Sequence, residues 1–262
     1  MNAKLDTARV FERIFEIYRD QFTLLIPAAL VVFVPVAVIN GIVYAGDVSI
    51  FGVVIVAAVA TIATYWFQGM VVEAARDILD GRRDHTIGSL VQSATPVIGP
   101  LIGAGILAGL AIGIGLIIIV PGLYLLTIWA VIAPVIVIER TGAIEAFGRS
   151  RELVRGYGWQ VFGVILVIFL LTVILGLVIQ SLANSASDSF AGFAVADLLL
   201  RLLVAPISAL AAAVLFFELK ALRGEPVLGT GPGGEVTPDG GPAPTPAEPP
   251  PPPPPPPPTG AA

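Results

Sequence analysis

Residues 134–163 read PVIVIERTGAIEAFGRSRELVRGYGWQVFG, and this stretch joins the end of one apolar run to the start of another through a charged connector. The first run stops at Glu139, and the second begins at Trp159. In the connector, apolar residues such as Phe147 alternate with charged residues such as Arg149 at the spacing of an amphipathic helix. Two apolar runs linked in this way indicate membrane-spanning helices with an amphipathic surface helix between them.

The composition of the whole chain also indicates a membrane protein. Of its 262 residues, 56% are hydrophobic and 13% are charged, and the mean hydropathy of +0.92 is too high for an ordinary soluble domain. Cysteine is absent, which excludes disulfides and thiolate metal sites, and the single histidine, His85, forms no cluster. The acids and bases nearly balance before Gly224, so no basic face exists for a nucleic-acid partner.

Six apolar runs are long enough to cross a lipid bilayer as helices. A spanning helix needs about 20 mostly apolar residues, and the period-two alternation of a barrel strand is missing. We therefore predict an all-α integral membrane protein whose six-span membrane domain covers residues 22–223, with a turn at Pro121 and Gly122 between spans three and four. The predicted spans are residues 22–44, 50–72, 97–120, 123–138, 159–182 and 197–217.

The basic residues predict the orientation of the spans, because lysine and arginine retain their segments on the cytoplasmic side. They occur before span one, between spans two and three, between spans four and five, and after span six, whereas the other three loops contain none. We therefore expect both termini in the cytoplasm. A charged segment precedes the first run and five more apolar runs follow it, which argues against a cleaved signal sequence.

The amphipathic segments suggest an internal repeat. Shifting the first segment, within residues 1–22, by 136 positions places Phe11 on Phe147 and Arg19 on Arg155. We predict three hairpin units, each consisting of an interfacial amphipathic helix and a helical hairpin. Coincidence among unrelated surface helices is the alternative. The apolar side of the first segment is predicted to consist of Val10, Phe11, Ile14, Phe15, Tyr18 and Phe22.

The composition changes at Gly224. Residues 224–262 are rich in proline, glycine, alanine and threonine, and they include ten consecutive prolines at 249–258. Such a segment buries too little apolar surface to fold, so we predict a disordered Pro-rich cytoplasmic tail with an extended proline rod. The rod is either a ligand for an SH3-like or profilin-like protein partner or a spacer without a partner.

Small residues on the third span form the first candidate site. Glycines four residues apart create a groove in which a second helix backbone can approach closely. This groove is either the seam of a homo-oligomer or a packing surface for a neighbouring span of the same chain. The candidate helix-packing residues are Gly99, Gly103, Gly105, Gly109 and Gly113.

Charged residues beside the spans form two further candidate sites. Asp197 and Arg201 are four residues apart on the sixth span and can form an ion pair on one helix face. Near the outer end of that span, they form either a structural pair or a contact for a substrate or lipid head group. Spans two, four and six each end in an acid that has a base close by in the sequence. These acids form either a cation site or interfacial ion pairs, and they are Glu73, Glu139 and Glu218.

Catalytic motifs are missing from the sequence. It contains no GxSxG, HExxH or P-loop pattern and no paired buried carboxylates, so we expect no enzymatic activity and no cofactor. The connector at residues 134–163 and ARVFERIFEIYRDQF at residues 8–22 resemble the membrane domain family named after glycerophosphoryl diester phosphodiesterases, over roughly residues 6–223. The resemblance implies a multi-spanning module of the bacterial cytoplasmic membrane. The separate catalytic domain of some members is not expected here, and no catalytic residue is carried over.

Two functions remain open. We expect a non-enzymatic anchor, scaffold or accessory subunit that acts through its connectors and tail; the alternative is a transporter or lipid-handling protein with membrane lipids as partners. Spans one to five carry no charge near the middle of the bilayer, which argues against a coupled transporter. A cavity lined by polar groups at that depth would favour transport or lipid handling, whereas a tightly packed bundle would favour scaffolding.

Overall fold

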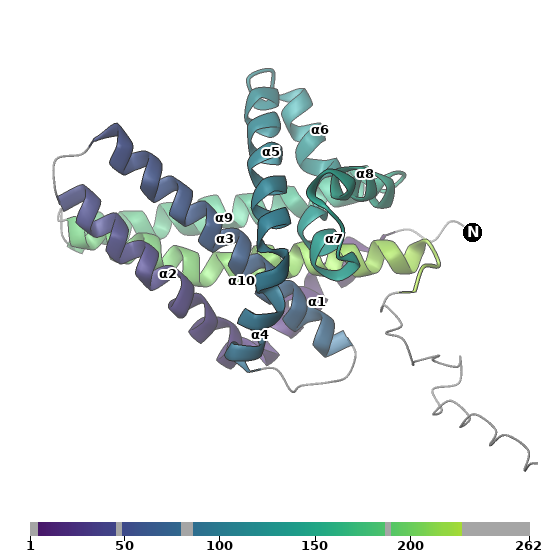
Figure 1. Ribbon diagram of the computed structural model, residues 1–262, viewed down its shortest axis with the longest axis horizontal. Helices are drawn as coiled ribbons and strands as arrows, with labels where there is room; N and C mark the ends of the chain where they lie inside the picture. The colour runs from purple at the N-terminus through teal and green to yellow at the C-terminus, as the bar shows by residue number, and fades with distance from the viewer. Residues whose placement is uncertain (1–4, 46–48, 80–85, 187–189, 227–262) are drawn as a thin grey trace, which may run out of the picture. The chain divides into compact units, whose positions relative to one another are not determined.

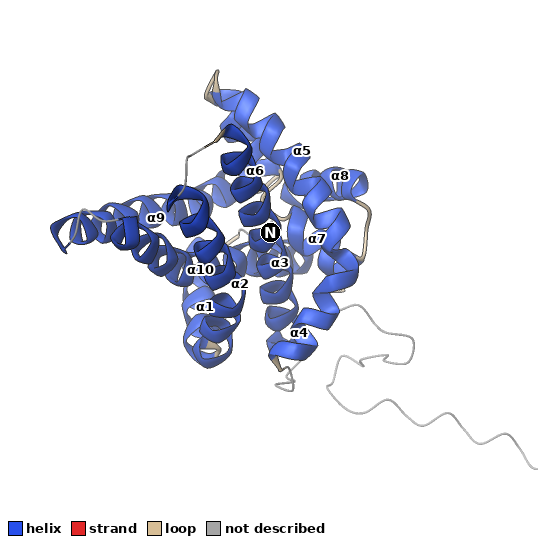
Figure 2. Ribbon diagram, turned by 60° about the vertical axis from the view of Figure 1, so that its left-hand side comes forward, coloured by secondary structure: helices blue, strands red, loops and turns tan. Residues whose placement is uncertain are grey.

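The computed structural model describes residues 5–45, 49–79, 86–186 and 190–226, which are helical apart from turns and short connections (Figures 1 and 2). In these ranges, six segments are long and apolar enough to cross a membrane, which confirms the predicted number of spans. His85 and the predicted disordered tail beyond residue 226 lie outside the described residues.

Three times along the chain, a short helix is followed by a long one. The predicted three-unit repeat stays a prediction, because an order of lengths does not measure similarity between units. In chain order, the helices are α1 (Thr7–Asp20), α2 (Phe22–Ala45), α3 (Ile50–Leu79), α4 (Ile87–Ala94), a 3-10 turn (Thr95–Val97), α5 (Ile98–Leu116), α6 (Val120–Ile128), α7 (Ile132–Glu139), α8 (Ala143–Val154), α9 (Gly158–Ala186) and α10 (Phe190–Leu222).

The fourth predicted span is interrupted and begins earlier than expected. Turn residues 129–131 separate α6 from α7, and the turn before α6 lies at residues 117–119 instead of Pro121 and Gly122. Pro121 stands in the first turn of α6, where the missing N–H of proline breaks no helical hydrogen bond. The prediction of a turn at Pro121 was therefore wrong, because proline starts this helix.

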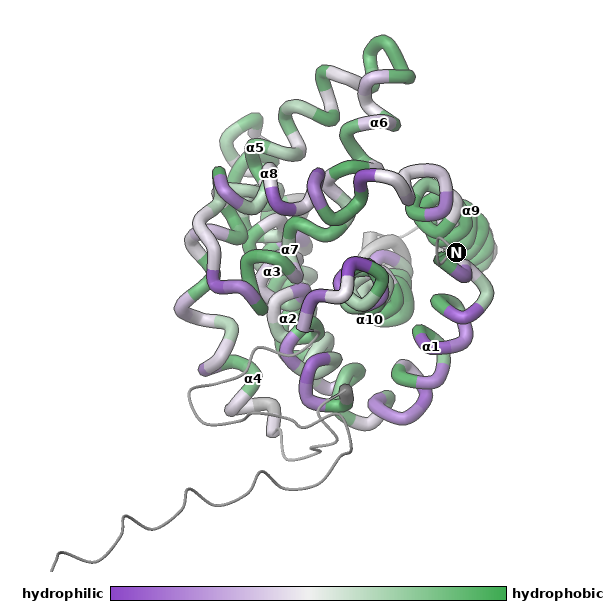
Figure 3. The backbone as a smooth tube through the Cα atoms, turned by 90° about the vertical axis from the view of Figure 1, so that its right-hand side faces the viewer, coloured by the Kyte–Doolittle hydropathy of each residue, from purple (hydrophilic) through white to green (hydrophobic). Residues whose placement is uncertain are grey.

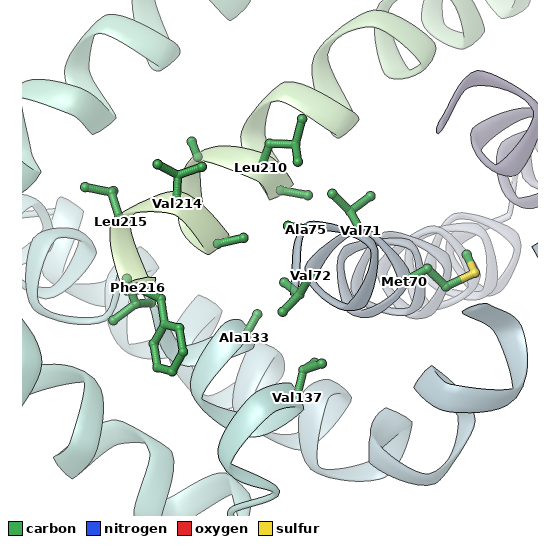
Figure 4. Close-up of a cluster of buried hydrophobic side chains, with 14 of the residues drawn as sticks. Met70, Val71, Val72, Ala75, Ala133, Val137, Leu210, Val214, Leu215 and Phe216 are labelled. Carbon is green, nitrogen blue, oxygen red and sulfur yellow. The ribbon is translucent and has the colours of Figure 1, made fainter. Parts of the chain in front are cut away.

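Helix α10 is the central helix of the bundle. In the most apolar stretch of α10, 56% of the residues are buried, whereas the corresponding share in α9 is 6%. Figure 4 shows Val71 of α3 close to Leu210 of α10, and Val72 of α3 on the side of Val137 of α7. These small and branched side chains let three helices approach closely, whereas the outer surface of α9 remains apolar, as a lipid-facing surface would be.

Helix α1 packs against α10 through one narrow face. Its buried residues are Val10, Ile14 and Ile17, which recur with helical spacing. Phe15 and Phe22, predicted on the apolar side, are 52% and 45% exposed. An exposed phenylalanine on an interfacial helix would face lipid, and Phe22 begins α2, so the predicted apolar side of the first segment stays a prediction. The interfacial position of α1 stays a prediction.

A buried hydroxyl connects α8 to the break between α6 and α7. The Oγ atom of Ser150 donates a hydrogen bond to the Ile128 carbonyl oxygen at 2.9 Å. Ile128 ends α6, so its carbonyl lacks a partner within that helix. We expect Ser150→Ala to lower the free energy of unfolding by about 1 kcal/mol, as measured by unfolding in detergent. Ser93→Ala is the control, because that hydroxyl bonds only Leu90 of its own helix; equal effects would contradict the account.

Candidate functional site

Ion pairs connect helix ends on one side of the bundle, which we call the charged end. Figure 3 shows hydrophilic stretches of α1, α8 and the last turns of α10 on the face toward the viewer. All three acids noted at the ends of the predicted spans lie in this cluster. The residues of the charged end are Arg13, Glu73, Glu139, Arg140, Arg149, Glu218 and Lys220.

Each of these acids contacts a base that is distant in sequence. Because every one of these carboxylates has a positive partner, none of them is left free to hold a cation. In the described ranges, no group of three or more His, Asp and Glu side chains could hold a metal ion. The pairs are Glu73 with Arg140 at 2.6 Å, Glu139 with Lys220 at 3.0 Å, and Glu218 with Arg13 at 3.7 Å.

Arg149 of α8 is a second partner of Glu139, and the sequence analysis did not identify it. Its Nε and Nη2 atoms donate to the two carboxylate oxygens of Glu139 at 2.9 and 3.1 Å. It also pairs with Glu225, which follows α10. The hydrogen bond to Glu139 raises the pKa of Arg149 above its ordinary value. The resulting stabilisation is therefore present below the ordinary arginine pKa and is lost only at higher pH.

The five glycines of α5 do not form one packing surface within the chain. A Cβ atom at Gly105 would overlap the ring of Tyr65 on α3, and one at Gly103 would lie 3.7 Å from the Ala143 Cβ. Beyond Gly105, α5 rises away from α3 (Figure 1). A homodimer seam on the open part stays a prediction. A Cβ atom would meet no described atom within 4 Å at Gly99, Gly109 and Gly113.

Leucine substitutions distinguish the packed part of α5 from the open part. We expect Gly105→Leu to lower the free energy of unfolding by about 1 to 3 kcal/mol, because the new side chain must displace Tyr65. In Gly109→Leu the new side chain enters open space, so the free energy of unfolding should change by less than about 0.5 kcal/mol. Melting curves in one detergent test both. Equal destabilisation would show that Gly109 is also packed, for example against a second copy.

Two cavities lie side by side within the bundle. The first, of about 280 Å³, has mostly apolar walls from α3, α5, α6, α7, α9 and α10. The second, of about 330 Å³, lies between α2, α3, α9 and α10. Gln68 of α3 and Ser208 of α10 line both. We call the two together the cleft. Figure 1 shows the α5–α6 turn well away from the left-hand ends of α2, α3 and α9, so the helices diverge on one side of the bundle.

Polar side chains of the cleft have unused hydrogen-bonding groups. Gln68, Ser208 and Tyr65 make no hydrogen bond to any residue that the structure describes. The hydroxyls of Thr64 and Thr172, by contrast, each donate to a backbone carbonyl at 2.8 Å. An unpaired polar group in apolar surroundings costs about 1 to 3 kcal/mol. A ligand with polar atoms at this position would recover that cost.

Asp197 and Arg201 line the second cavity. The Arg201 Nε donates to an Asp197 carboxylate oxygen at 2.7 Å, with the side chains 32% and 40% exposed. The two terminal nitrogens of Arg201 bond no described residue. The pair lies about 28 Å or more from Lys220 along α10, at about 1.5 Å per residue. It therefore stands far from the charged end, with donors left for an anionic group.

The two residues that join the cavities were not predicted from the sequence. Gln68 and Ser208 are neutral, stand alone in apolar runs and belong to no motif. An amide inside an apolar run was the available signal, because it is costly in lipid unless it is paired.

Comparison with known proteins finds no matching family, no similar curated protein and no solved structure of similar fold. The resemblance to the phosphodiesterase membrane family therefore stays a prediction.

Proposed function

We propose that the protein is a non-enzymatic, lipid-handling membrane protein that binds an amphipathic molecule in the cleft. The observation that carries the proposal is the pair of unpartnered polar side chains, Gln68 and Ser208, where two largely apolar cavities adjoin. Side chains placed in this way suit a ligand with a polar group and an apolar chain. The cleft is the reason for ranking lipid handling ahead of the scaffold function expected from the sequence.

Each part of such a ligand would meet a suitable partner in the cleft. The terminal nitrogens of Arg201 would bind the phosphate of a head group, and the Asp197 carboxylate would lie beside a positive group such as choline. Ser208 lies about 18 Å from Lys220 along α10, at about 1.5 Å per residue, which corresponds to the middle of a bilayer about 30 Å thick. Ester or hydroxyl groups would pair with Gln68 and Ser208. The chain would follow the apolar wall toward Trp129.

We also propose a placement in the membrane. The charged end lies at the cytoplasmic surface, with α1 and α8 in the interface and the three hairpin units spanning the bilayer. The distribution of basic residues supports this placement, as does the exposed apolar surface of α9. Both termini then lie in the cytoplasm, and Asp197 and Arg201 lie near the opposite surface.

Native mass spectrometry of the full chain, purified in mild detergent, tests the proposed function. We expect copurified lipid on the unmodified protein and one bound lipid fewer in Ser208→Phe, because the larger side chain fills the point where the cavities adjoin. Leu199→Phe is the matched control on the same helix, at a residue that is 47% exposed and lines neither cavity. Equal retention of lipid by both variants, with both folded, would contradict lipid binding in the cleft.

A further inference from the structure

A third cavity forms a groove between α6 and the start of α9, separate from the cleft. Its volume is about 600 Å³, and it shares no lining residue with the cleft. One face of α6 supplies Val120, Leu123, Tyr124, Thr127 and Ile128 at helical spacing. The Thr127 hydroxyl is already paired, since it donates to the Leu123 carbonyl at 2.8 Å. The α6 wall therefore offers an apolar chain a continuous apolar surface.

The groove starts beside α8 and extends away from it. The end of α6 packs on α8, because Ser150 bonds the Ile128 carbonyl and the Trp129 ring lies 4.8 Å from that of Phe147. Figure 1 shows α8 beside the lower end of α6. Val120, at the other end of α6, marks the far end of the groove. The remaining wall comes from Gly156, Gly158, Trp159 and Phe162.

Unpaired arginines stand at the α8 end of the groove. In the described part of the chain, three basic side chains make no hydrogen bond or ion pair, namely Arg9, Arg151 and Arg155. Arg155 directly precedes Gly156 of the groove wall, and Arg151 lies one turn earlier on α8. The nearest acid in sequence, Glu152, pairs with Arg149 instead. The Trp159 side chain beside them is 85% exposed, as is common for aromatic residues at a membrane surface.

We infer that this groove is a binding site for an anionic phospholipid. Arg151 and Arg155 bind the phosphate, Trp159 lies at the level of the head group, and one acyl chain extends along α6 toward Val120. The charge complementarity selects an anionic lipid over a zwitterionic one, because neither arginine has a carboxylate partner within the described residues. The site is independent of the cleft and does not depend on the function proposed for it.

The test compares phosphatidylglycerol with phosphatidylcholine as bound lipids of the full chain in native mass spectrometry. We expect preferential retention of phosphatidylglycerol, and a loss of about fivefold in its affinity for each of Arg151→Gln and Arg155→Gln. Arg9→Gln is the matched control, because it removes an equally unpaired charge from α1. Ser208→Phe should leave this preference unchanged, which separates the groove from the cleft.

Photo-crosslinking with a photoreactive phosphatidylglycerol locates the bound lipid. Crosslinks should fall on α6 and the first turns of α9, at residues such as Tyr124 and Phe162. Crosslinks confined to other helices would overturn the inference. An equal loss of affinity in Arg9→Gln would also overturn it, because general charge attraction would then explain the binding. Retention of both lipids without preference would have the same consequence.

Discussion

Replacing Glu139 with glutamine should lower the free energy of unfolding by about 3 to 5 kcal/mol, because it leaves the enclosed Lys220 without a carboxylate and removes one of the carboxylate partners of Arg149. The Lys220 side chain is only 9% exposed, and its Nζ lies 3.0 Å from a Glu139 oxygen. Arg149 loses both of its hydrogen bonds to the same carboxylate. Chemical unfolding in detergent micelles measures the change.

A second substitution separates the buried pair from general electrostatics. Combining Glu139→Gln with Lys220→Met should recover part of the lost stability, since no unpaired charge then remains at Lys220. Glu152→Gln is the control, because Glu152 also pairs with Arg149 but its side chain is 62% exposed; we expect less than about 1 kcal/mol there. A similar loss for Glu139→Gln and Glu152→Gln would show that burial of the pair has no influence on stability.

Replacing Arg201 with glutamine should weaken binding of lysophosphatidylcholine in the cleft by about 10- to 100-fold, the range expected when a charged donor to an anion is lost. The terminal nitrogens of Arg201 have no partner among the described residues, so their donors remain available for a phosphate. Titration of the purified chain with this single-chain lipid measures the affinity. The affinity of Arg201→Lys should fall between those of the unmodified chain and Arg201→Gln, because lysine keeps the charge but lacks the planar guanidinium group. Unchanged affinity in Arg201→Gln would remove Arg201 from the site.

Most of the helical architecture could be predicted from the length of the apolar runs. A run of about 20 apolar residues has few alternatives in lipid, so the number of spans follows from counting. The break at residues 129–131 lies just before Pro134, which has no N–H to bond the Ala130 carbonyl. Proline alone does not predict such a break, because Pro27, Pro35 and Pro206 lie inside continuous helices. At the break, the Ile128 carbonyl is paired by Ser150, a contact with α8 that local sequence does not encode.

The partners of the charged residues were also beyond the sequence. Each acid at a span end has a base close by in the chain, and proximity suggests local pairs. In the fold, Arg140 contacts Glu73 of α3, whereas Lys220 reaches across to Glu139. Tertiary packing decides which ends meet, so sequence predicts that charges gather at span ends but not which of them pair.

The cleft was the least predictable feature. Gln68 and Ser208 lie on different helices, and neither belongs to a motif. Small residues on α5 and α10, together with the divergence of the α5–α6 hairpin, leave the space between them. Only the folded bundle brings the two polar groups to one place.

The reactivity of a single thiol in the cleft tests the central claim most directly. The chain contains no cysteine, so Ser208→Cys introduces the sole thiol of the protein. In lipid nanodiscs, we predict that this thiol reacts with a small maleimide and that saturating lysophosphatidylcholine slows the reaction at least about tenfold, as occupancy of the site requires. Leu199→Cys, outside the cleft, should show no such protection. A thiol at position 208 that does not react, or that reacts equally with and without the lipid, would contradict a ligand-binding cleft.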